Sequence, residues 1–247
     1  MVRVVLCQFE AGSGILPDER RLIIESQPDF VALPEYFFAP QEPGTQADLA
    51  SRAPEFLEYL ASLSLDTAAA VIGGTLVERR EGKLYNTCPV FDRGHEIARY
   101  DKRHPTLSEI RQGITPGQSA VVVEVRGVRI APLVCADVLQ PGRFDEAGAL
   151  GARILFTPVV SPFRPDDTLE QKEFRDRSIF LEGARRARAF VVKTAAPGRV
   201  FGGRLQGRSL VAAPWGFLAR VSSDQEQNRM MLTVDLDPSR LPPPFLK

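Results

Sequence analysis

Cysteine and histidine are scarce in this chain of 247 residues, which contains three cysteines and two histidines. The cysteines, Cys7, Cys88 and Cys135, are far apart and form no Cys-x-x-Cys pair, so a zinc site has no support. A sparse, odd number of cysteines is typical of free thiols in a reducing compartment. We therefore expect a cytoplasmic protein without a metal or another cofactor.

Net charge, long apolar runs and phosphate-binding loops are also lacking. The chain has 31 Lys and Arg residues against 31 Asp and Glu residues, which gives no support for binding to nucleic acid or to a membrane surface. No apolar run approaches the roughly 20 residues of a membrane helix. The N-terminal sequence MVRVVLCQFEAG leads directly into strand-like sequence with no visible signal peptide, and no GxGxxG or Walker motif follows it. The basic residues are scattered, which predicts surface and salt-bridge roles for them.

Short apolar segments alternate with amphipathic segments along the whole chain. The strand-like segments are 2–10, 29–35, 68–79, 81–93, 95–101, 120–137 with a turn at Arg126-Gly127, 153–160, 190–196, 207–214, 216–223 and 229–237. The helical segments are 17–26, 47–65 with a break at Pro54, 144–152, and 168–189 with Thr168 as N-cap. Residues 103–118 are rich in Gly, Pro, Ser and Thr, which predicts a loop. No linker interrupts the pattern, so we expect one layered α/β domain over residues 1–247.

Three reactive side chains stand at the ends of predicted strands. Glu35 follows VALP, Lys102 follows IARYD, and Cys135 follows APLV. Taken singly, these residues are explained as a turn acid, a surface charge and a buried core thiol. Taken together, they form a chemical unit, because a carboxylate can accept the thiol proton and an ammonium can stabilise the resulting anions. Strand ends are also where α/β folds place reacting groups.

The motifs around these residues resemble those of the nitrilase (carbon–nitrogen hydrolase) superfamily. VALPEYF, RYDKRHP and LVCAD occur in the family's order, and further resemblance extends over KLYNTCPVFDRGHEIARYDK, GARILFTPVVSP and GRSLVAAPWGFLA. The resemblance covers nearly the whole chain and implies a four-layer αββα sandwich. Cys-Ala-Asp at the nucleophile differs from the Cys-Trp-Glu of true nitrilases, which favours an amide over a nitrile as substrate.

The resemblance also implies roles for single residues. Glu35, Lys102 and Cys135 form the catalytic set, and Glu109 in TLSEIRQG matches the family's second Glu, although its sequence context is also that of a surface acid on a loop. By analogy, Cys135 attacks the carbonyl carbon, Glu35 moves the protons, and Lys102 with the backbone N–H of Ala136 holds the oxyanion. The implied product is an acyl thioester that water hydrolyses.

Other positions fit a substrate pocket or depart from the family. Tyr36, Val159 and Val160 are candidates for an apolar pocket, although plain core packing explains them equally well. Carbamoylases of this superfamily that bind a carboxylate carry a pair of Arg residues soon after the nucleophile. Val138 and Leu139 stand in that region here, so no carboxylate anchor is expected there.

Three alternatives remain open at this point. The same site in an acyltransferase would pass the acyl group to an acceptor other than water. A non-catalytic relative would act as a binding or assembly module. A Cys-His hydrolase would use His104, which we otherwise interpret as loop support, as its base. The expected partners are a small amide and water, and the resemblance also implies a homodimer or larger oligomer.

Overall fold

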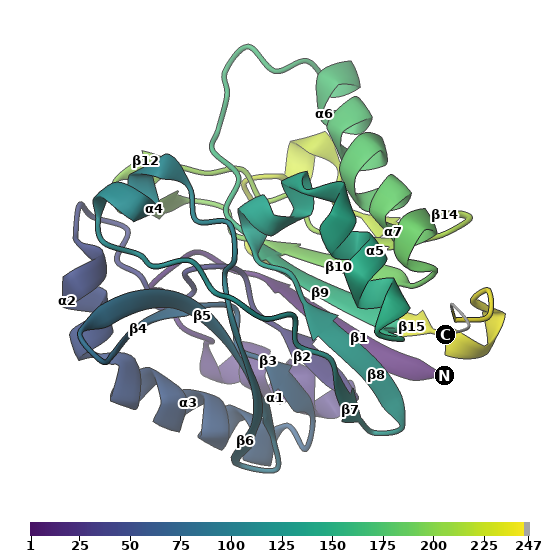
Figure 1. Ribbon diagram of the computed structural model, residues 1–247, viewed down its shortest axis with the longest axis horizontal. Coiled ribbons are helices and arrows are strands. Elements are labelled where there is room, and N and C mark those ends of the chain that lie inside the picture. The colour runs from purple at the N-terminus through teal and green to yellow at the C-terminus, as the bar shows by residue number, and fades with distance from the viewer. Residues whose placement is uncertain (245–247) are drawn as a thin grey trace.

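The computed structural model describes residues 1–244, in which two β-sheets pack face to face between two layers of helices (Figure 1). The first sheet has the order β15-β1-β2-β3-β5-β4, with β6 paired to β5, and the second has the order β14-β13-β10-β9-β8-β7. This is the predicted αββα sandwich. The strands of the first sheet are β1 (Val2–Gln8), β2 (Phe30–Ala32), β3 (Ala70–Ile72), β4 (Leu76–Arg80), β5 (Lys83–Asp92), β6 (His95–Asp101) and β15 (Met230–Leu236). Those of the second are β7 (Val123–Val125), β8 (Val128–Pro132), β9 (Ile154–Val159), β10 (Phe190–Ala195), β13 (Leu210–Ala213) and β14 (Gly216–Arg220).

The helices and short elements complete the chain. The α-helices are α1 (Pro17–Glu25), α2 (Gln46–Ser51), α3 (Ala53–Asp66), α4 (Leu107–Arg111), α5 (Pro141–Ala149), α6 (Leu169–Asp176) and α7 (Glu182–Ala187). The remaining elements are the single turns η1 (Cys135–Leu139), η2 (Arg177–Leu181), η3 (Ser223–Gln225) and η4 (Pro238–Arg240), and the small hairpin β11 (Arg199–Val200) and β12 (Gly203–Arg204). The π-helical turn η2 joins α6 to α7, so the long helix predicted over 168–189 is confirmed, and Thr168 caps it by accepting a hydrogen bond from the N–H of Gln171 at 3.2 Å.

The alternating direction of side chains along each strand produces the apolar layers on both faces of the sheets. Successive side chains of a strand point to opposite faces, so Phe156 of β9 packs between the sheets while Leu155 packs against the helices. The helices α5, η2 and α7 cover the outer face of the second sheet, and α1 and α3 cover that of the first. The core between the sheets includes an aromatic pair, Phe30 and Phe156, whose ring centroids are 5.4 Å apart.

Three details of the sequence-based prediction were wrong. Residues 103–118 contain the helix α4, which Thr106 caps through its side chain. The segment 68–79 is two strands, because Gly73 and Gly74 separate β3 from β4. The break in the helix at 47–65 lies at Arg52, and Pro54 occupies the first turn of α3, where its missing N–H is tolerated.

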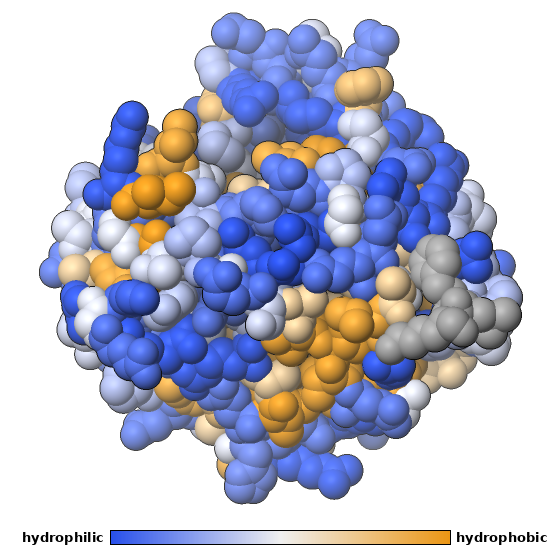
Figure 2. All heavy atoms as spheres, viewed as in Figure 1, coloured by the Kyte–Doolittle hydropathy of each residue, from blue (hydrophilic) through white to orange (hydrophobic). Residues whose placement is uncertain are grey.

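The face of the molecule seen in Figure 2 is mostly hydrophilic, with apolar side chains gathered in a patch in the region of β7 and β8. Residues such as Val121 and Val123 in this region are only partly buried against the core between the sheets. Over residues 1–244, none of the helices combines the length and the apolar character that crossing a bilayer requires.

Packing between the sheets predicts a large cost for a cavity at Phe156. Phe156→Ala is expected to lower the free energy of unfolding by about 3–5 kcal/mol, because this ring is fully buried. Phe174→Ala is the control, since Phe174 is 70% exposed, and its effect is expected within about 0.5 kcal/mol. Urea unfolding followed by circular dichroism measures both values. Equal losses in the two variants would contradict the layered core.

Candidate active site

The three reactive residues of the sequence motifs meet at one end of the sandwich. Glu35 follows β2, Lys102 follows β6, and Cys135 begins η1, three residues after the end of β8. The Lys102 Nζ donates a hydrogen bond to Glu35 Oε1 at 2.7 Å, and both side chains are at most 1% exposed. The thiol of Cys135 interacts with the carboxyl group of Glu35. Segments about 30 to 100 residues apart in the chain thus place a sulfur, a carboxyl group and an ammonium side by side.

The backbone of Val160 joins the thiol to Glu35. Its N–H donates to Glu35 Oε2 at 3.0 Å, and its carbonyl oxygen accepts from Cys135 Sγ at 3.6 Å. Val160 follows β9, which lies between β8 and β10, so the strand next to β8 positions both the Cys135 thiol and the Glu35 carboxyl group.

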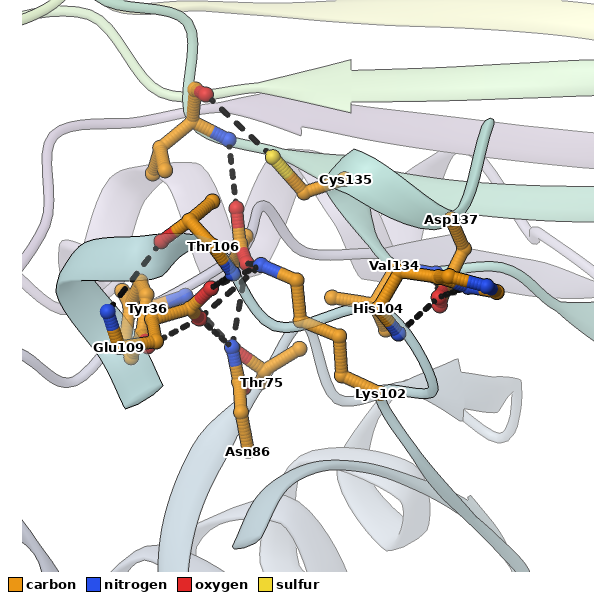
Figure 3. A network of polar contacts seen from close by, with 12 residues as sticks. Tyr36, Thr75, Asn86, Lys102, His104, Thr106, Glu109, Val134, Cys135 and Asp137 are labelled. Atoms are coloured by element: carbon orange, nitrogen blue, oxygen red, sulfur yellow. Dashed lines mark hydrogen bonds and ion pairs between the residues drawn. The ribbon is translucent and has the colours of Figure 1, made fainter. Parts of the chain in front are cut away.

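Glu109 is the most heavily bonded side chain of the cluster (Figure 3). Its carboxylate accepts from Lys102 Nζ at 2.8 and 2.9 Å, from the Tyr36 hydroxyl at 2.6 Å and from Asn86 Nδ2 at 2.8 Å. It also accepts from the N–H of Thr106 at 2.7 Å, which closes the capping box of α4. Glu109 is therefore a buried member of the ionic cluster, and the interpretation as a surface acid is wrong.

The electrostatics divide the cluster into groups of fixed and variable charge. Burial tends to raise the pKa of Glu109, but the nearby Lys102 and the hydrogen bonds that Glu109 accepts lower it overall. Burial tends to lower the pKa of Lys102, but Glu35 and the other acidic groups outweigh it and raise that pKa. Lys102 and Glu109 are thus a stable ion pair.

Glu35 and Cys135 differ from that pair because burial determines their ionisation. Burial raises the pKa of Glu35; Lys102 opposes this effect and the Glu109 carboxylate reinforces it. Burial also raises the pKa of the Cys135 thiol, and the neighbouring Glu35 adds to the increase. The sulfur is consequently a thiol at neutral pH, and Glu35 is the adjacent group with a raised affinity for a proton.

The backbone around both residues takes conformations that are uncommon for non-glycine residues. Cys135 has a φ of 45° and Tyr36, directly after Glu35, has a φ of 54°. Gly74, with a φ of 61°, packs against the chain just before Glu35, and a Cβ at this position would lie 2.1 Å from the Pro34 carbonyl oxygen. These turns direct Glu35 and Cys135 away from the ends of their strands and toward each other.

Asp137 connects the loop after Lys102 to the turn that contains Cys135. Its Oδ1 accepts from the backbone N–H groups of Arg103 and His104 at 3.1 and 2.8 Å. Its Oδ2 accepts from the N–H of Val134 at 3.0 Å and from the Tyr100 hydroxyl at 2.8 Å. The His104 ring also contacts Asp137, with 3.0 Å between Nδ1 and Oδ1, as Figure 3 shows. His104 is therefore part of the loop support.

A cavity of about 600 Å³ opens beside the cluster. Its walls include all eight site residues that the sequence suggested, namely Glu35, Tyr36, Lys102, Glu109, Cys135, Ala136, Val159 and Val160. Tyr36 was expected to be an apolar wall, but its hydroxyl accepts from Gln46 at 3.1 Å and donates to Glu109. Among the other cysteines, Cys7 and Cys88 are buried in the core.

Several residues of the site were missed from the sequence. Asn86 lies in the middle of β5 and donates to both Glu35 and Glu109, at 3.1 and 2.8 Å. Lys193 and Arg208, expected on the surface with the other basic residues, are buried and line the cavity. A lysine inside the apolar strand FVVKTAA, and an asparagine inside the strand-like KLYNTCPVFD, were signals that could have identified two of them.

Comparisons with known proteins agree with this geometry. The family model described as carbon-nitrogen hydrolase matches residues 21–242. The hydrolase C26A3.11 of Schizosaccharomyces pombe is 27% identical over 227 residues, which are 85% of this chain and 66% of that protein. Omega-amidase NIT2 of Xenopus tropicalis is 28% identical over 225 residues, which are 84% of this chain and 76% of that protein.

Solved structures share the fold. A carbon-nitrogen hydrolase from Helicobacter pylori G27 superposes with a TM-score of 0.81 at 20% identity, covering 97% of this chain and 90% of that one. A mutant amidase from Nesterenkonia sp. AN1, with the acetamide moiety of fluoroacetamide added covalently at its active site cysteine, gives a TM-score of 0.76 at 19% identity, covering 96% and 91%. Because the family model spans most of the sequence, this chain belongs to the carbon–nitrogen hydrolase family.

Proposed function

We propose that the protein is an amidase that cleaves the non-peptide carbon–nitrogen bond of a small amide through a thioester on Cys135. The observation that carries the proposal is the buried contact of Lys102 with Glu35 and Glu109, next to a thiol in a cavity wall. An amide is favoured over a nitrile because the relatives and structural neighbours include an omega-amidase and an amidase. The covalent acetamide on the neighbour's cysteine supports a cysteine nucleophile here.

The first half of the reaction forms the thioester. Glu35, in its ionised form, takes the proton of the Cys135 thiol as Sγ attacks the carbonyl carbon. Glu35 then gives this proton to the amide nitrogen, the carbon–nitrogen bond breaks, and ammonia or an amine leaves. The raised pKa of Glu35 suits the first of these proton transfers, since a base with a higher proton affinity removes the thiol proton more readily.

Two donors are assigned to the oxyanion of the tetrahedral intermediate. Lys102 supplies an ammonium that is held in place by Glu35 and Glu109. The backbone N–H of Ala136 follows Cys135, whose left-handed conformation is of the kind that turns successive N–H groups toward an anion. Each fixed donor of this type contributes roughly 3–4 kcal/mol to the stability of the transition state.

The second half of the reaction releases the acid. Glu35 takes a proton from water as the water oxygen attacks the thioester carbonyl, and the proton returns to Sγ when the carbon–sulfur bond breaks. The thiol and the Glu35 carboxylate are thereby restored. Glu109 serves as a positioning residue that keeps Lys102 charged and in place.

Other assignments accompany this proposal. His104 is not among the residues of the cavity wall and contacts Asp137 instead, which supports its role in the loop rather than as the base of a Cys-His hydrolase. Residues 1–247 are proposed to be a single catalytic domain in the cytoplasm. The homodimer or larger oligomer expected from the family resemblance stays a prediction.

Ammonia release from a panel of amides, nitriles and ureides tests the proposed activity. We expect turnover of at least one amide, an acyl adduct on Cys135 in intact-protein mass spectra, and a loss of about 10³-fold or more in Cys135→Ala. Turnover that survives in Cys135→Ala would refute the mechanism. Adding hydroxylamine separates the acyltransferase alternative, because preferential hydroxamate formation without acid would indicate acyl transfer.

Thiol alkylation identifies the base without any substrate. Glu35→Gln is expected to slow the reaction of Cys135 with iodoacetamide by about 10²-fold, because it removes the proton acceptor. His104→Ala is the matched variant and is expected to change the rate by less than about threefold. Second-order rates from mass spectrometry give both values. The opposite order would favour a Cys-His hydrolase.

The pH dependence of this alkylation tests the coupling within the cluster. The rate should fall as the pH falls through the raised pKa of Glu35, so its acid limb should lie above the usual carboxyl range. Glu109→Gln removes a negative charge that raises the Glu35 pKa, and the limb should move to lower pH by about one unit. Rates measured from about pH 4 to pH 8 show the shift. A limb that stays in place or moves upward would disprove the coupling.

A further inference from the structure

The cavity extends beyond the catalytic cluster to a second group of buried charges. Lys193 of β10 and Arg208, just before β13, line its wall and are 1% and 4% exposed. Both donate to Asp176 Oδ1 at the end of α6, at 3.5 and 2.8 Å. None of these residues has a part in the proposed cleavage.

The charges of this second group do not balance. Asp176 is shared by three cations, because Arg220 also lies 3.2 Å from its Oδ2. Arg220 has a carboxylate of its own in Glu173, at 3.2 Å. Lys193 and Arg208 therefore depend on one shared negative charge, and burying a cation without a full partner is costly. The arrangement leaves excess positive charge at the wall of the cavity.

Unpaired polar atoms occur in the same place. Arg208 Nε and Nη1 are buried and have no hydrogen-bond partner within residues 1–244. Buried guanidinium N–H groups are normally satisfied, and an exception requires an explanation. A ligand that presents oxygen acceptors would supply the missing partners.

The ionisation of Lys193 agrees with this interpretation. Burial lowers the pKa of Lys193 to about 8, and the repulsion by Arg208 and Arg220 adds to the effect, against the attraction of Asp176. An additional negative charge near the Nζ would raise this pKa toward its usual range.

The position of Lys193 relative to Cys135 limits the size of the ligand. Lys193 pairs with Thr157 of β9, and β9 pairs with β8, which Cys135 follows. Two strand spacings, about 10 Å, therefore separate β10 from β8 across the sheet, and Cys135 lies three residues beyond the end of β8. Apolar side chains line the same cavity, among them Val138, Ile179 and Phe180. The space suits a short aliphatic chain.

We propose that Lys193 and Arg208 form an anion subsite, and that the substrate is a short aliphatic amide with a carboxylate at its other end. This inference rests on the proposed amide hydrolysis at Cys135. The positively charged residues come from β10 and the segment before β13, whereas Val138 and Leu139 next to the nucleophile carry no charge.

Two amides of equal chain length test the subsite. Glutaramate carries a terminal carboxylate, and pentanamide has a methyl group in its place. We expect the wild type to prefer glutaramate in kcat/KM by about 100-fold, and Arg208→Gln to reduce this ratio by about 30-fold. Lys193→Met should also reduce the ratio, and it provides a second measurement if Arg208→Gln does not fold. An equal preference for pentanamide in the wild type, or a ratio unaffected by both variants, would overturn the subsite.

Arg220→Gln is the matched control. Arg220 contacts the same Asp176 but is not among the lining residues of the cavity. We expect this variant to keep the wild-type ratio of the two amides. If Arg220→Gln reduces the ratio as much as Arg208→Gln does, the effect arises from the charge cluster as a whole and the direct contact is refuted.

Binding of glutarate separates this inference from the proposed activity. In Cys135→Ser, titration calorimetry should detect saturable binding of glutarate that is lost when Arg208→Gln is added. This result supports the subsite even if no amide is hydrolysed. Conversely, a protein that hydrolyses pentanamide but binds no glutarate retains the proposed activity and loses the subsite.

Discussion

A buried ammonium shared by two carboxyl groups is the interaction on which the site depends. Lys102 connects Glu35, which follows β2, with Glu109 of α4, and all three side chains are nearly inaccessible to solvent. Burying such charges is costly unless each has partners with good geometry. Asn86 and Tyr36 complete those partners, since both bond to Glu109. The ends of three distant segments must therefore meet accurately, or the cluster would be a liability to the fold.

The same cluster gives its two carboxyl groups different chemistry. Glu109 accepts hydrogen bonds from Lys102, Tyr36 and the N–H of Thr106, which lower its pKa against the effect of burial. Glu35 also accepts hydrogen bonds, but burial together with the charge of Glu109 outweighs the effect of Lys102 and raises the pKa of Glu35. One acid is thus fixed as an anion, and the other is left able to exchange a proton. In the proposed reaction, the structural acid tunes the acid that moves protons.

The sequence identified those parts of the site that are local in the chain. Glu35, Lys102 and Cys135 each stand at or near the end of a strand-like segment, so motif and strand pattern point to the same residues. The helix α4 was missed because residues 103–118 are rich in Gly, Pro, Ser and Thr, although Thr106 and Glu109 form a capping box. Lys193 and Arg208 were misjudged for a different reason. Their burial follows from Asp176, which ends α6 and whose position is determined by the packing of the following η2 and α7 on the second sheet.

The two charged groups that line the cavity have a consequence for the proposed turnover. The group near Cys135 contains two carboxyl groups and one ammonium, whereas the group around Asp176 contains more cations than anions. An amide with a terminal carboxylate would be oriented by this polarity, because its neutral end is tolerated near Glu35 and its charged end is not. The proposed hydrolysis would create a second carboxylate beside Glu35 and Glu109, where the negative charge of Glu109 would repel it. The charge pattern that orients the proposed substrate would thereby also favour release of the acid product.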